Sequence, residues 1–404
     1  MFVPLYLKLN ISCLIPKKRV GEMESILFVL FTLGILVWLV FLLDALIGLR
    51  NLDSLEKEPE LETGPLLSVI VAARNEEKQI KASILSQLKQ TYKHVEWILV
   101  NDRSTDDTGI IMNELLKEDP RIQVIHINEL PKGWLGKNHA LYKGALQASG
   151  KWILFTDADV KYKKEAFSKA LYYFEKHQLD HLTAAPNLHA NRFWLKSFVA
   201  FFLFGFSYFK RPWMANNPKS KIGTGIGAFN LVSQEAYEAF GTHKKIKMRP
   251  DDDLQLGMKM KRAGYRQRIV TALHLIEVEW YGSLKEAFIG LEKNTFAGLN
   301  YRISMVFFSI FGVFVTNVLP FLTIFSANKT IVLLSLGNIV TSGILYVVII
   351  RRMTVFSPAM FVVLPITALL FIYSIIRASF LTFKRGGIVW RGTTYRLSEL
   401  REKD

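Results

Sequence analysis

The sequence is poor in cysteine and in charged residues. Its single cysteine, Cys13, excludes an internal disulfide framework and any metal site built from several cysteines. Only 21% of the 404 residues are charged and 50% are hydrophobic, which is too apolar for an ordinary soluble protein. The 25 glycines and 13 prolines are too few for a collagen-like or low-complexity chain. We therefore expect part of the chain to lie in lipid.

The charge that is present is mostly positive. Lysine and arginine number 51 against 35 aspartates and glutamates, which gives a formal net charge of +16. This excess suits anionic partners, such as phosphate-bearing substrates or acidic lipid headgroups. Nucleic acid is not an expected partner, because the basic residues are scattered and the aromatic residues lie in lipid-like runs.

Four long apolar runs are each long enough to cross a hydrocarbon core of about 30 Å. They predict one N-terminal transmembrane helix and three C-terminal ones, over residues 24–49, 303–326, 331–350 and 354–381. A cleavable signal peptide is the alternative for the first run, but no small-residue cleavage site follows it. Residues 1–22 form a leader, which we interpret as the product of an upstream translation start, with Met23 as the natural first residue.

Basic residues beside these runs predict their orientation. Arg50, Arg302 and Arg351 lie at ends that the positive-inside rule assigns to the cytoplasm. The region between the first two runs, residues 65–302, is then a cytoplasmic domain of a multi-pass cell-membrane protein. The basic tail, residues 382–404, contradicts a simple count, because the run before it should end outside. Either that run does not cross fully or the tail breaks the rule.

Strand and helix patterns alternate in the region between the runs. Apolar, β-branched segments predict buried strands at residues 67–73, 95–100, 122–127 and 152–156. With amphipathic helices between them, these strands predict an α/β fold with a mostly parallel sheet. Ligands bind such sheets at the carboxyl ends of the strands. The polar side chains at those ends include Arg74, Glu76 and Asp102, which are candidate substrate contacts.

The sequence Asp157-Ala158-Asp159 follows the fourth predicted strand. Carboxylates at this spacing can converge on one hard cation, and Mg²⁺ or Mn²⁺ binds such groups together with substrate phosphate. We therefore expect a divalent metal at Asp157 and Asp159, with Asp157 also close to substrate. The alternative is a turn that caps the next helix. Lys137, in the loop of residues 133–137, is a candidate diphosphate contact or a solvated surface lysine.

Asp251-Asp252-Asp253 opens a further predicted helix. Adjacent carboxylates raise one another's pKa, which favours a general base, whereas the plain alternative is a first turn stabilised by the helix dipole.

Residues 193–213 are rich in phenylalanine, with cations and tryptophan at the two ends of the segment. They predict an interfacial helix, with a buried core helix as the alternative. The glycine-rich run at 223–227 is expected to let the backbone approach substrate.

Four ordered motifs resemble those of membrane-bound family 2 glycosyltransferases of the GT-A fold. They cover residues 69–76, 101–108, 156–159 and 252–264. The resemblance extends over about residues 67–302. The loop at 133–137 and the tail at 387–392 are similar to the subgroup that includes carotenoid, hopanoid-associated and ceramide glycosyltransferases.

This resemblance implies an inverting transfer of one sugar from a nucleoside diphosphate sugar, most often UDP-linked, to a membrane lipid or isoprenoid acceptor. Asp102 would hold the nucleoside. Asp157 and Asp159 would manage the diphosphate and the metal, Mn²⁺ or Mg²⁺. Asp253, with Asp252 beside it, would be the catalytic base. The implied partners are therefore the donor, the lipid acceptor and the bilayer.

The sequence departs from the family pattern in three places. Asn101 replaces the first aspartate of a pair, and Asp252 replaces a glutamate. The motif Gln-x-x-Arg-Trp is missing before residue 303, where Lys293 is expected to supply its substrate-binding cation. Two alternative functions stay open. A processive polysaccharide synthase is disfavoured by the missing motif, and a polyprenyl-phosphate sugar transferase is favoured by the cations at residues 244–249.

Overall fold

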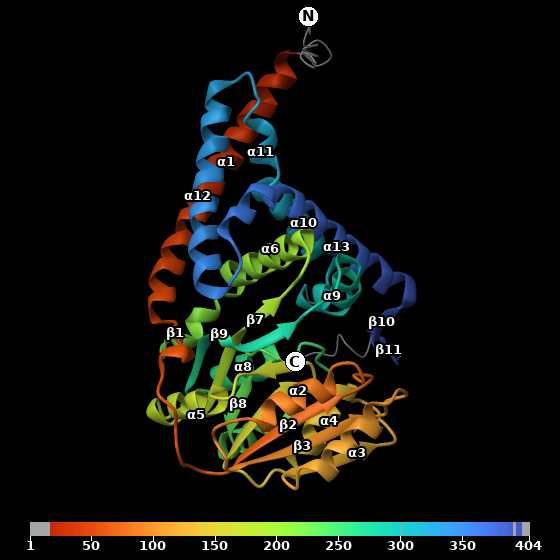
Figure 1. Ribbon diagram of the computed structural model, residues 1–404. Helices are drawn as coiled ribbons and strands as arrows, with labels where there is room; N and C mark the ends of the chain where they lie inside the picture. Colours follow the sequence, from red (N-terminus) through yellow and green to blue (C-terminus); the bar gives the residue numbers. More distant parts are fainter. Residues whose placement is uncertain (1–16, 300, 391–392, 398–404) are drawn as a thin grey trace, which may run out of the picture.

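The computed structural model describes residues 17–299, 301–390 and 393–397. Strands of these residues form one mixed sheet of nine strands, in the order β1-β9-β7-β8-β5-β2-β3-β4, with β6 paired to β9. Figure 1 shows this sheet and its covering helices at one end of the molecule and the long apolar helices at the other. The predicted leader lies, for residues 1–16, outside the described residues.

The elements of the sheet region alternate along the chain between two long helical regions. The strands are β1 Asp53–Ser54, β2 Leu67–Ala73, β3 Val95–Asp102, β4 Ile122–Ile127, β5 Trp152–Asp157, β6 Val160–Tyr162, β7 His181–His189, β8 Asn230–Ser233, β9 Gln267–Glu279, β10 Gly387–Trp390 and β11 Thr393–Arg396. The helices before the second helical region are α1 Lys17–Gly48, α2 Ile80–Leu88, α3 Thr108–Glu118, α4 Gly136–Ala145, α5 Ala166–Lys176, α6 Phe193–Lys210, α7 Gln234–Phe240, α8 Asp252–Arg262 and α9 Leu284–Gly298. The later helices are α10 Ile303–Asn317, α11 Leu319–Thr323, α12 Lys329–Met353, the short 3₁₀ helix η6 Pro358–Val363 and α13 Leu364–Arg385.

The strands β4, β3, β2 and β5 form the parallel half of the sheet. Their apolar side chains are almost all buried, because helices cover both faces. The register pairs Ala72 with Asp157 and Ala73 with Asn101, so the carboxyl ends of β2, β3 and β5 lie at one edge. β3 and β5 run on to Asp102 and Asp157, past their predicted ends.

The other half of the sheet contains strands that the apolar pattern did not reveal. β8 runs antiparallel between β5 and β7, and β9 runs parallel to β7. Buried polar groups interrupt these strands and pair with one another. His181 lies 3.0 Å from the Asn230 side chain and 2.7 Å from that of Gln267.

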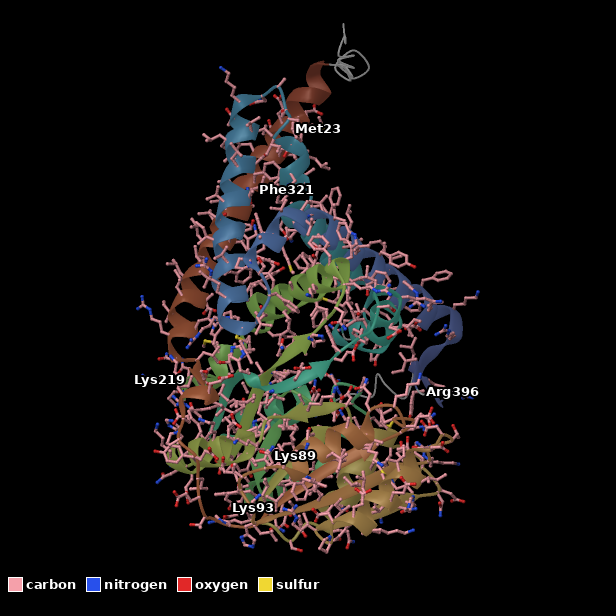
Figure 2. All side chains as sticks on the ribbon, in the orientation of Figure 1. Met23, Lys89, Lys93, Lys219, Phe321 and Arg396 are labelled. Atoms are coloured by element: carbon pink, nitrogen blue, oxygen red, sulfur yellow. The ribbon has the colours of Figure 1, made fainter. Side chains whose placement is uncertain are left out.

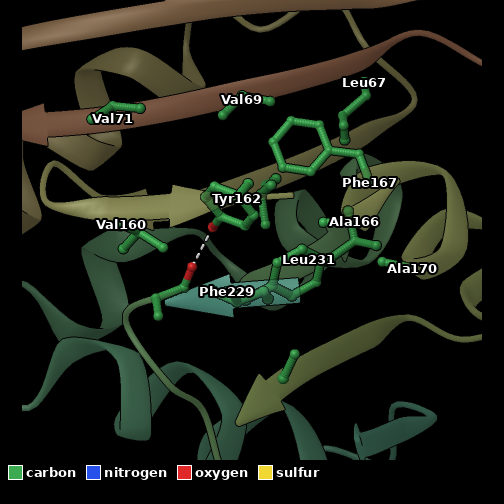
Figure 3. Close-up of a cluster of buried hydrophobic side chains, with 14 of the residues drawn as sticks. Leu67, Val69, Val71, Val160, Tyr162, Ala166, Phe167, Ala170, Phe229 and Leu231 are labelled. Carbon is green, nitrogen blue, oxygen red and sulfur yellow. Dashed lines mark hydrogen bonds between the residues drawn. The ribbon is translucent and has the colours of Figure 1, made fainter. Parts of the chain in front are cut away.

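The core beneath the sheet is a cluster of aliphatic and aromatic side chains. Figure 3 shows Leu67, Val69 and Leu231 packed with Tyr162 and Phe167. The Tyr162 hydroxyl donates a hydrogen bond to the Ala228 carbonyl, drawn as a dashed line. This bond satisfies a polar group inside the core and fixes the chain that leads into β8.

Four helical segments of the described chain are long and apolar enough to cross a membrane. One is N-terminal and three are C-terminal, as predicted, and they span Gly21–Asn51, Ile303–Thr323, Lys329–Met353 and Pro358–Arg385. α1 and α12 run side by side, and the Asn338 amide donates to the Phe31 carbonyl at 2.9 Å (Figure 1). Figure 2 shows Met23 and Phe321 at the end of this bundle far from Lys89 and Lys93. These helices fit a membrane protein.

α6, within the predicted interfacial segment, is covered over most of its surface. It packs against α13, α12 and α9, and its ring of Phe201 stands 5.7 Å from that of Phe371. Phe193, Trp194 and Phe209 at its two ends remain exposed. A buried helix therefore describes the middle of α6, and only its ends are open.

Asn216 joins the end of the first apolar helix to the sheet. Its side-chain amide donates to the carbonyls of Asn51, at 2.8 Å, and Ile269, at 2.9 Å. Its carbonyl oxygen accepts the Ile269 N–H at 2.7 Å. The Asn216 side chain is buried, so its loss would leave these backbone groups without partners.

Replacing Asn216 with alanine should therefore lower the free energy of unfolding by about 1–3 kcal/mol, the cost of leaving buried polar groups unpaired. The measurement is the thermal transition of the detergent-solubilised protein. Asn217→Ala is the matched control, because Asn217 is exposed and its side chain accepts a hydrogen bond from the nearby Lys219 N–H. Equal transitions for the two variants would contradict the role given to Asn216.

Candidate active site

Asp102 ends β3 at the edge where the parallel strands finish. Arg103 binds both of its oxygens, with Nε at 2.7 Å from Oδ1 and a terminal nitrogen at 3.1 Å from Oδ2. Arg74 stands 4.0 Å from the same carboxylate. A Cβ at Gly136 would meet Asp102 Oδ2 at 2.2 Å, so only glycine allows α4 to begin this close. The Asp102 carboxylate therefore lies between the guanidinium groups of Arg103 and Arg74 and the backbone at Gly136.

The loop after β2 is fastened to the loop after β3. The Asn75 N–H donates to Ser104 Oγ at 3.1 Å, and the Thr105 N–H donates to Asn75 Oδ1 at 2.9 Å. The Glu76 N–H donates to Thr108 Oγ1 at 2.7 Å. These bonds hold Arg74 near Asp102 and Glu76 on the side of Asp159, whose pKa Glu76 helps to raise.

Lys137 lies in the first turn of α4, which begins at Gly136, so the predicted loop is shorter than expected. Its ammonium stands 2.7 Å from Asp157 Oδ1 and 3.3 Å from Asp252 Oδ2. Burial acts to lower the pKa of Lys137, but Asp157 and Asp252 outweigh it and raise this pKa above its ordinary value. Lys137 is thus the counter-ion that joins two acidic motifs, and not a solvated surface lysine.

The three consecutive aspartates at the start of α8 have different partners. Asp251 pairs with Arg249 at 3.1 Å, and Asp252 pairs with Lys137. Asp253 accepts backbone N–H groups, from Gly227 at 2.7 Å and from Leu254 at 2.8 Å. Burial raises the pKa of Asp253, Lys137 opposes this and Asp157 adds to it. Because Asp252 and Asp253 lie in the first turn, the helix dipole also favours their charge.

The glycine-rich run at 223–227 passes between the two acidic motifs. A Cβ at Gly227 would meet Asp157 Oδ2 at 2.4 Å, and one at Gly225 would meet the Asp253 carbonyl at 2.0 Å. The Gly227 carbonyl also accepts the Asp157 N–H at 3.0 Å. The glycines therefore let this backbone approach the aspartates themselves, and Gly227 links Asp157 to Asp253.

Asp159 faces a polar cavity of 180 Å³, whose lining includes Lys161, His189 and Glu277. Burial, and then the charges of Asp157 and Glu76, raise the pKa of Asp159 to about 7. Carboxylates that repel one another in this way suit a divalent cation. Among the described residues no three such side chains form a metal cluster. A cation at Asp157 and Asp159 would therefore take its remaining ligands from substrate phosphate or water.

Three contacts of the candidate site were not predicted from the sequence: Arg103 on Asp102, the Gly227 N–H on Asp253, and Tyr395 on Gly136. The Tyr395 hydroxyl of β11 accepts the Gly136 N–H at 3.4 Å, next to Arg103. The similarity of the tail at 387–392 to known enzymes was the available signal for β10 and β11. The side chain of Lys293, a predicted substrate contact, lies outside the described residues.

Comparison with known proteins finds a matching family model and a similar fold. Residues 68–241 match the family model described as glycosyl transferase family 2. An uncharacterized glycosyltransferase of Haemophilus influenzae is 40% identical over 124 residues, 31% of this chain and 36% of that protein. The 4,4'-diaponeurosporenoate glycosyltransferase of Staphylococcus aureus MRSA252 is 23% identical over 349 residues, 82% of this chain and 89% of that one. The chain spans about a third to two fifths of the first curated relatives it matches.

Two further proteins are similar to this chain, one in sequence and one in fold. The UDP-Glc:alpha-D-GlcNAc-diphosphoundecaprenol beta-1,3-glucosyltransferase WfaP of Escherichia coli is 37% identical over 110 residues, 27% of this chain and 41% of that protein. The mannosyltransferase PcManGT from Pyrobaculum calidifontis, solved in complex with GDP-Man and Mn2+, superposes with a TM-score of 0.54. Its identity is 15%, and the match covers 89% of this chain and 98% of that one. The predicted GT-A fold is confirmed by this likeness.

The raised pKa of Asp159 predicts a pH dependence of stability in metal-free protein. In the folded protein Asp159 keeps its proton up to about pH 7, whereas in the unfolded chain it loses the proton near pH 3.8, the ordinary value for an aspartate. The contribution of Asp159 to the free energy of unfolding is therefore fully present below pH 4. It is lost as the pH rises through 7, by at most about 1.4 kcal/mol per pH unit. Asp159→Asn should remove this loss, and thermal melts in EDTA from pH 4 to 8 measure it. Asp107→Asn, at an exposed site, is the control, and identical pH profiles for Asp159→Asn and the unmodified protein would contradict the assignment.

Proposed function

We propose that this chain, which carries a glycosyltransferase family 2 domain, transfers one sugar from a nucleoside diphosphate sugar to a membrane lipid or isoprenoid acceptor, with inversion at the sugar carbon. One observation carries the proposal. The ammonium of Lys137 lies between the carboxylates of Asp157 and Asp252, and Asp253 is the next residue after Asp252. A cation for the diphosphate and a carboxylate for the acceptor proton are therefore close together at one edge of the sheet.

The donor would lie along the ends of β3 and β5. Asp102, oriented by Arg103, offers carboxylate oxygens to a ribose or base, with Arg74 close by. Lys137 offers a cation to the diphosphate, at the N-terminus of α4, where backbone N–H groups also favour anions. UDP is the nucleotide we propose, because it is the usual donor in the family that the motifs resemble.

A divalent cation fits the same edge. Asp157 and Asp159 would hold it, with Glu76 adding negative charge, and the raised pKa of Asp159 reflects charge that such a cation would neutralise. When bound, it would offset the charge of the departing diphosphate. The Mn2+ in the PcManGT complex supports this choice of ion.

Asp253 would take the proton from the acceptor hydroxyl. Its two oxygens are oriented by the N–H groups of Gly227 and Leu254, and burial raises its pKa, which makes it a better proton acceptor. Asp252 would act through Lys137, which it helps to position. Attack by the hydroxyl on the face opposite the diphosphate inverts the sugar carbon.

The acceptor side of the site faces the apolar helices. α6 and α9, beside the catalytic edge, pack directly against α13 (Figure 1). A lipid headgroup could reach Asp253 from the bilayer, on the side that we propose is cytoplasmic. The names of the relatives, which act on diaponeurosporenoate and on a diphosphoundecaprenol, support lipid-linked acceptors.

The alternative acceptor, a polyprenyl phosphate, was favoured by the cations at residues 244–249. Lys244 lies over the ring of Tyr142 and Lys245 over the ring of Phe240, so both ammonium groups already have partners, which weakens the case for a phosphate acceptor bound there.

Product analysis tests the reaction. Purified membranes incubated with a panel of radiolabelled UDP-sugars should yield one labelled product in the lipid extract. Asp253→Asn should lower turnover by about 10²–10⁴, the usual loss for a general base, with donor binding nearly unchanged. Asp251→Asn is the matched control, because it removes a neighbouring carboxylate that pairs with Arg249 and leaves the N–H contacts of Asp253 in place. Label that stays in the aqueous phase, or that grows into a polymer ladder, would refute a single transfer to lipid.

Chelation tests the metal. Excess EDTA should stop sugar transfer, and added Mn²⁺ or Mg²⁺ should restore it, because Asp157 and Asp159 are anionic and only a cation held by them would offset the charge of a leaving diphosphate. The measurement is the initial rate of lipid labelling against free metal concentration. Undiminished transfer in excess chelator would exclude the metal role of these aspartates.

A further inference from the structure

The last apolar helix begins on the catalytic-domain side of the membrane helices. It follows α12, whose C-terminal end is fixed beside the sheet. The Arg352 guanidinium donates to the Leu52 carbonyl, one residue before β1. The opposite end of α12 lies far from the sheet, where Ser335 Oγ is 2.8 Å from Thr323 Oγ1 of α11. α12 therefore returns the chain to the catalytic domain before η6 begins.

The same helix also ends on the catalytic-domain side. Arg377 and Arg385 of α13 both bind Glu292 of α9, a carboxylate that is 8% exposed. The chain then turns at Gly386, with φ of +67°, into the β10–β11 hairpin. Ile388 and Tyr395 of this hairpin pack with Leu135, directly before α4. Figure 2 shows Arg396 beside the sheet region, at the end of the molecule away from Met23 and Phe321.

A segment with both ends on one side makes no net crossing. We propose that the chain crosses the membrane three times, through α1, α10–α11 and α12, and that η6 and α13 form a re-entrant segment embedded in the leaflet next to the catalytic domain. This inference goes beyond the proposed function and does not depend on it. In Figure 1, α13 lies across α6 and α9 instead of along the α1–α12 pair.

The surface of α13 fits contact with lipid on one side. Its exposed large apolar residues recur every three or four positions, at 41–62% exposure, and these are Ile366, Leu369, Tyr373, Ile376, Phe380 and Phe383. Such spacing gives a single stripe along a helix. The other side is buried against the protein through Ala368, Ile375 and Ala378. One side of α13 is therefore open to acyl chains and the other side is held by the protein.

The acyl chains of that leaflet are the occupant of the stripe. η6, which leads into α13, packs on α12, and the groove of 640 Å³ between α12 and η6 is lined by apolar residues such as Ile344, Val348 and Val362. Lys384 is exposed at the end of α13, where lipid headgroups would meet it. The arrangement also places Lys384 and Arg385, at the end of α13, and Arg396, after it, on the side of Arg50 and Arg351, which agrees with the positive-inside rule.

Cysteine labelling tests this topology without any assay of activity. The chain's single cysteine is replaced (Cys13→Ser), and one cysteine is introduced in turn by Lys89→Cys, Lys329→Cys, Lys384→Cys or Phe380→Cys. All four positions are exposed on the protein surface. A membrane-impermeant maleimide is applied to intact cells and to inverted vesicles, and each variant is checked by size-exclusion chromatography.

The cysteine at 384 should be labelled only in the preparation that labels position 89, on the catalytic domain, and position 329 only in the other. The cysteine at 380 should resist labelling in both preparations and react at least tenfold faster after detergent is added. Labelling of 384 together with 329 would show that α13 crosses the membrane and would overturn the proposal. Labelling of 380 in vesicles at the rate of 89 would show that water, not lipid, covers the stripe, and would overturn it equally.

Discussion

The half-buried ammonium of Lys137 holds together the edge of the sheet that carries the candidate active site. Asp157, Asp252 and Asp253 converge from β5 and α8, and without a cation their charges would repel one another. A buried charge that loses its partner is strongly destabilising, so Lys137 fixes the relative position of the two acidic motifs. α4 begins at Gly136 because the helix must start against Asp102 to deliver this side chain. The site is therefore arranged by charge compensation before any substrate is present.

The same reasoning explains how the domain is joined to the apolar helices. Polar groups that would be costly in lipid are paired across the boundary. Asp44 of α1 accepts hydrogen bonds from Arg211 and from the Trp213 indole, and Arg352 of α12 caps the Leu52 carbonyl. Glu292 of α9 pairs with two arginines of α13. Each contact holds one of the apolar helices, or the segment next to it, against the domain that carries the candidate site, so the two parts share one packed boundary.

The parallel half of the sheet could be predicted from sequence because its strands are buried on both faces. The segments 67–73 and 122–127 are short, β-branched and bounded by turns, and β2 and β4 have these bounds. β7 and β9 were missed because polar residues such as His181 and Gln267 interrupt them and pair only in the folded state. The acidic motifs could be recognised by their spacing. The role of Lys137 could not, because Asp252 lies more than a hundred residues away along the chain.

Tyr395 contributes the final contact to the edge that begins at β2. Its hydroxyl meets the Gly136 N–H, beside the arginine that holds Asp102. Domains generally fold from the N-terminus as synthesis proceeds, so the sheet forms while most of the apolar helices are still unmade. β11, which carries Tyr395, is synthesised only after α10 to α13. The acidic motifs are therefore synthesised before Tyr395. The contact of Tyr395 with Gly136 forms only after the last apolar helix has been made.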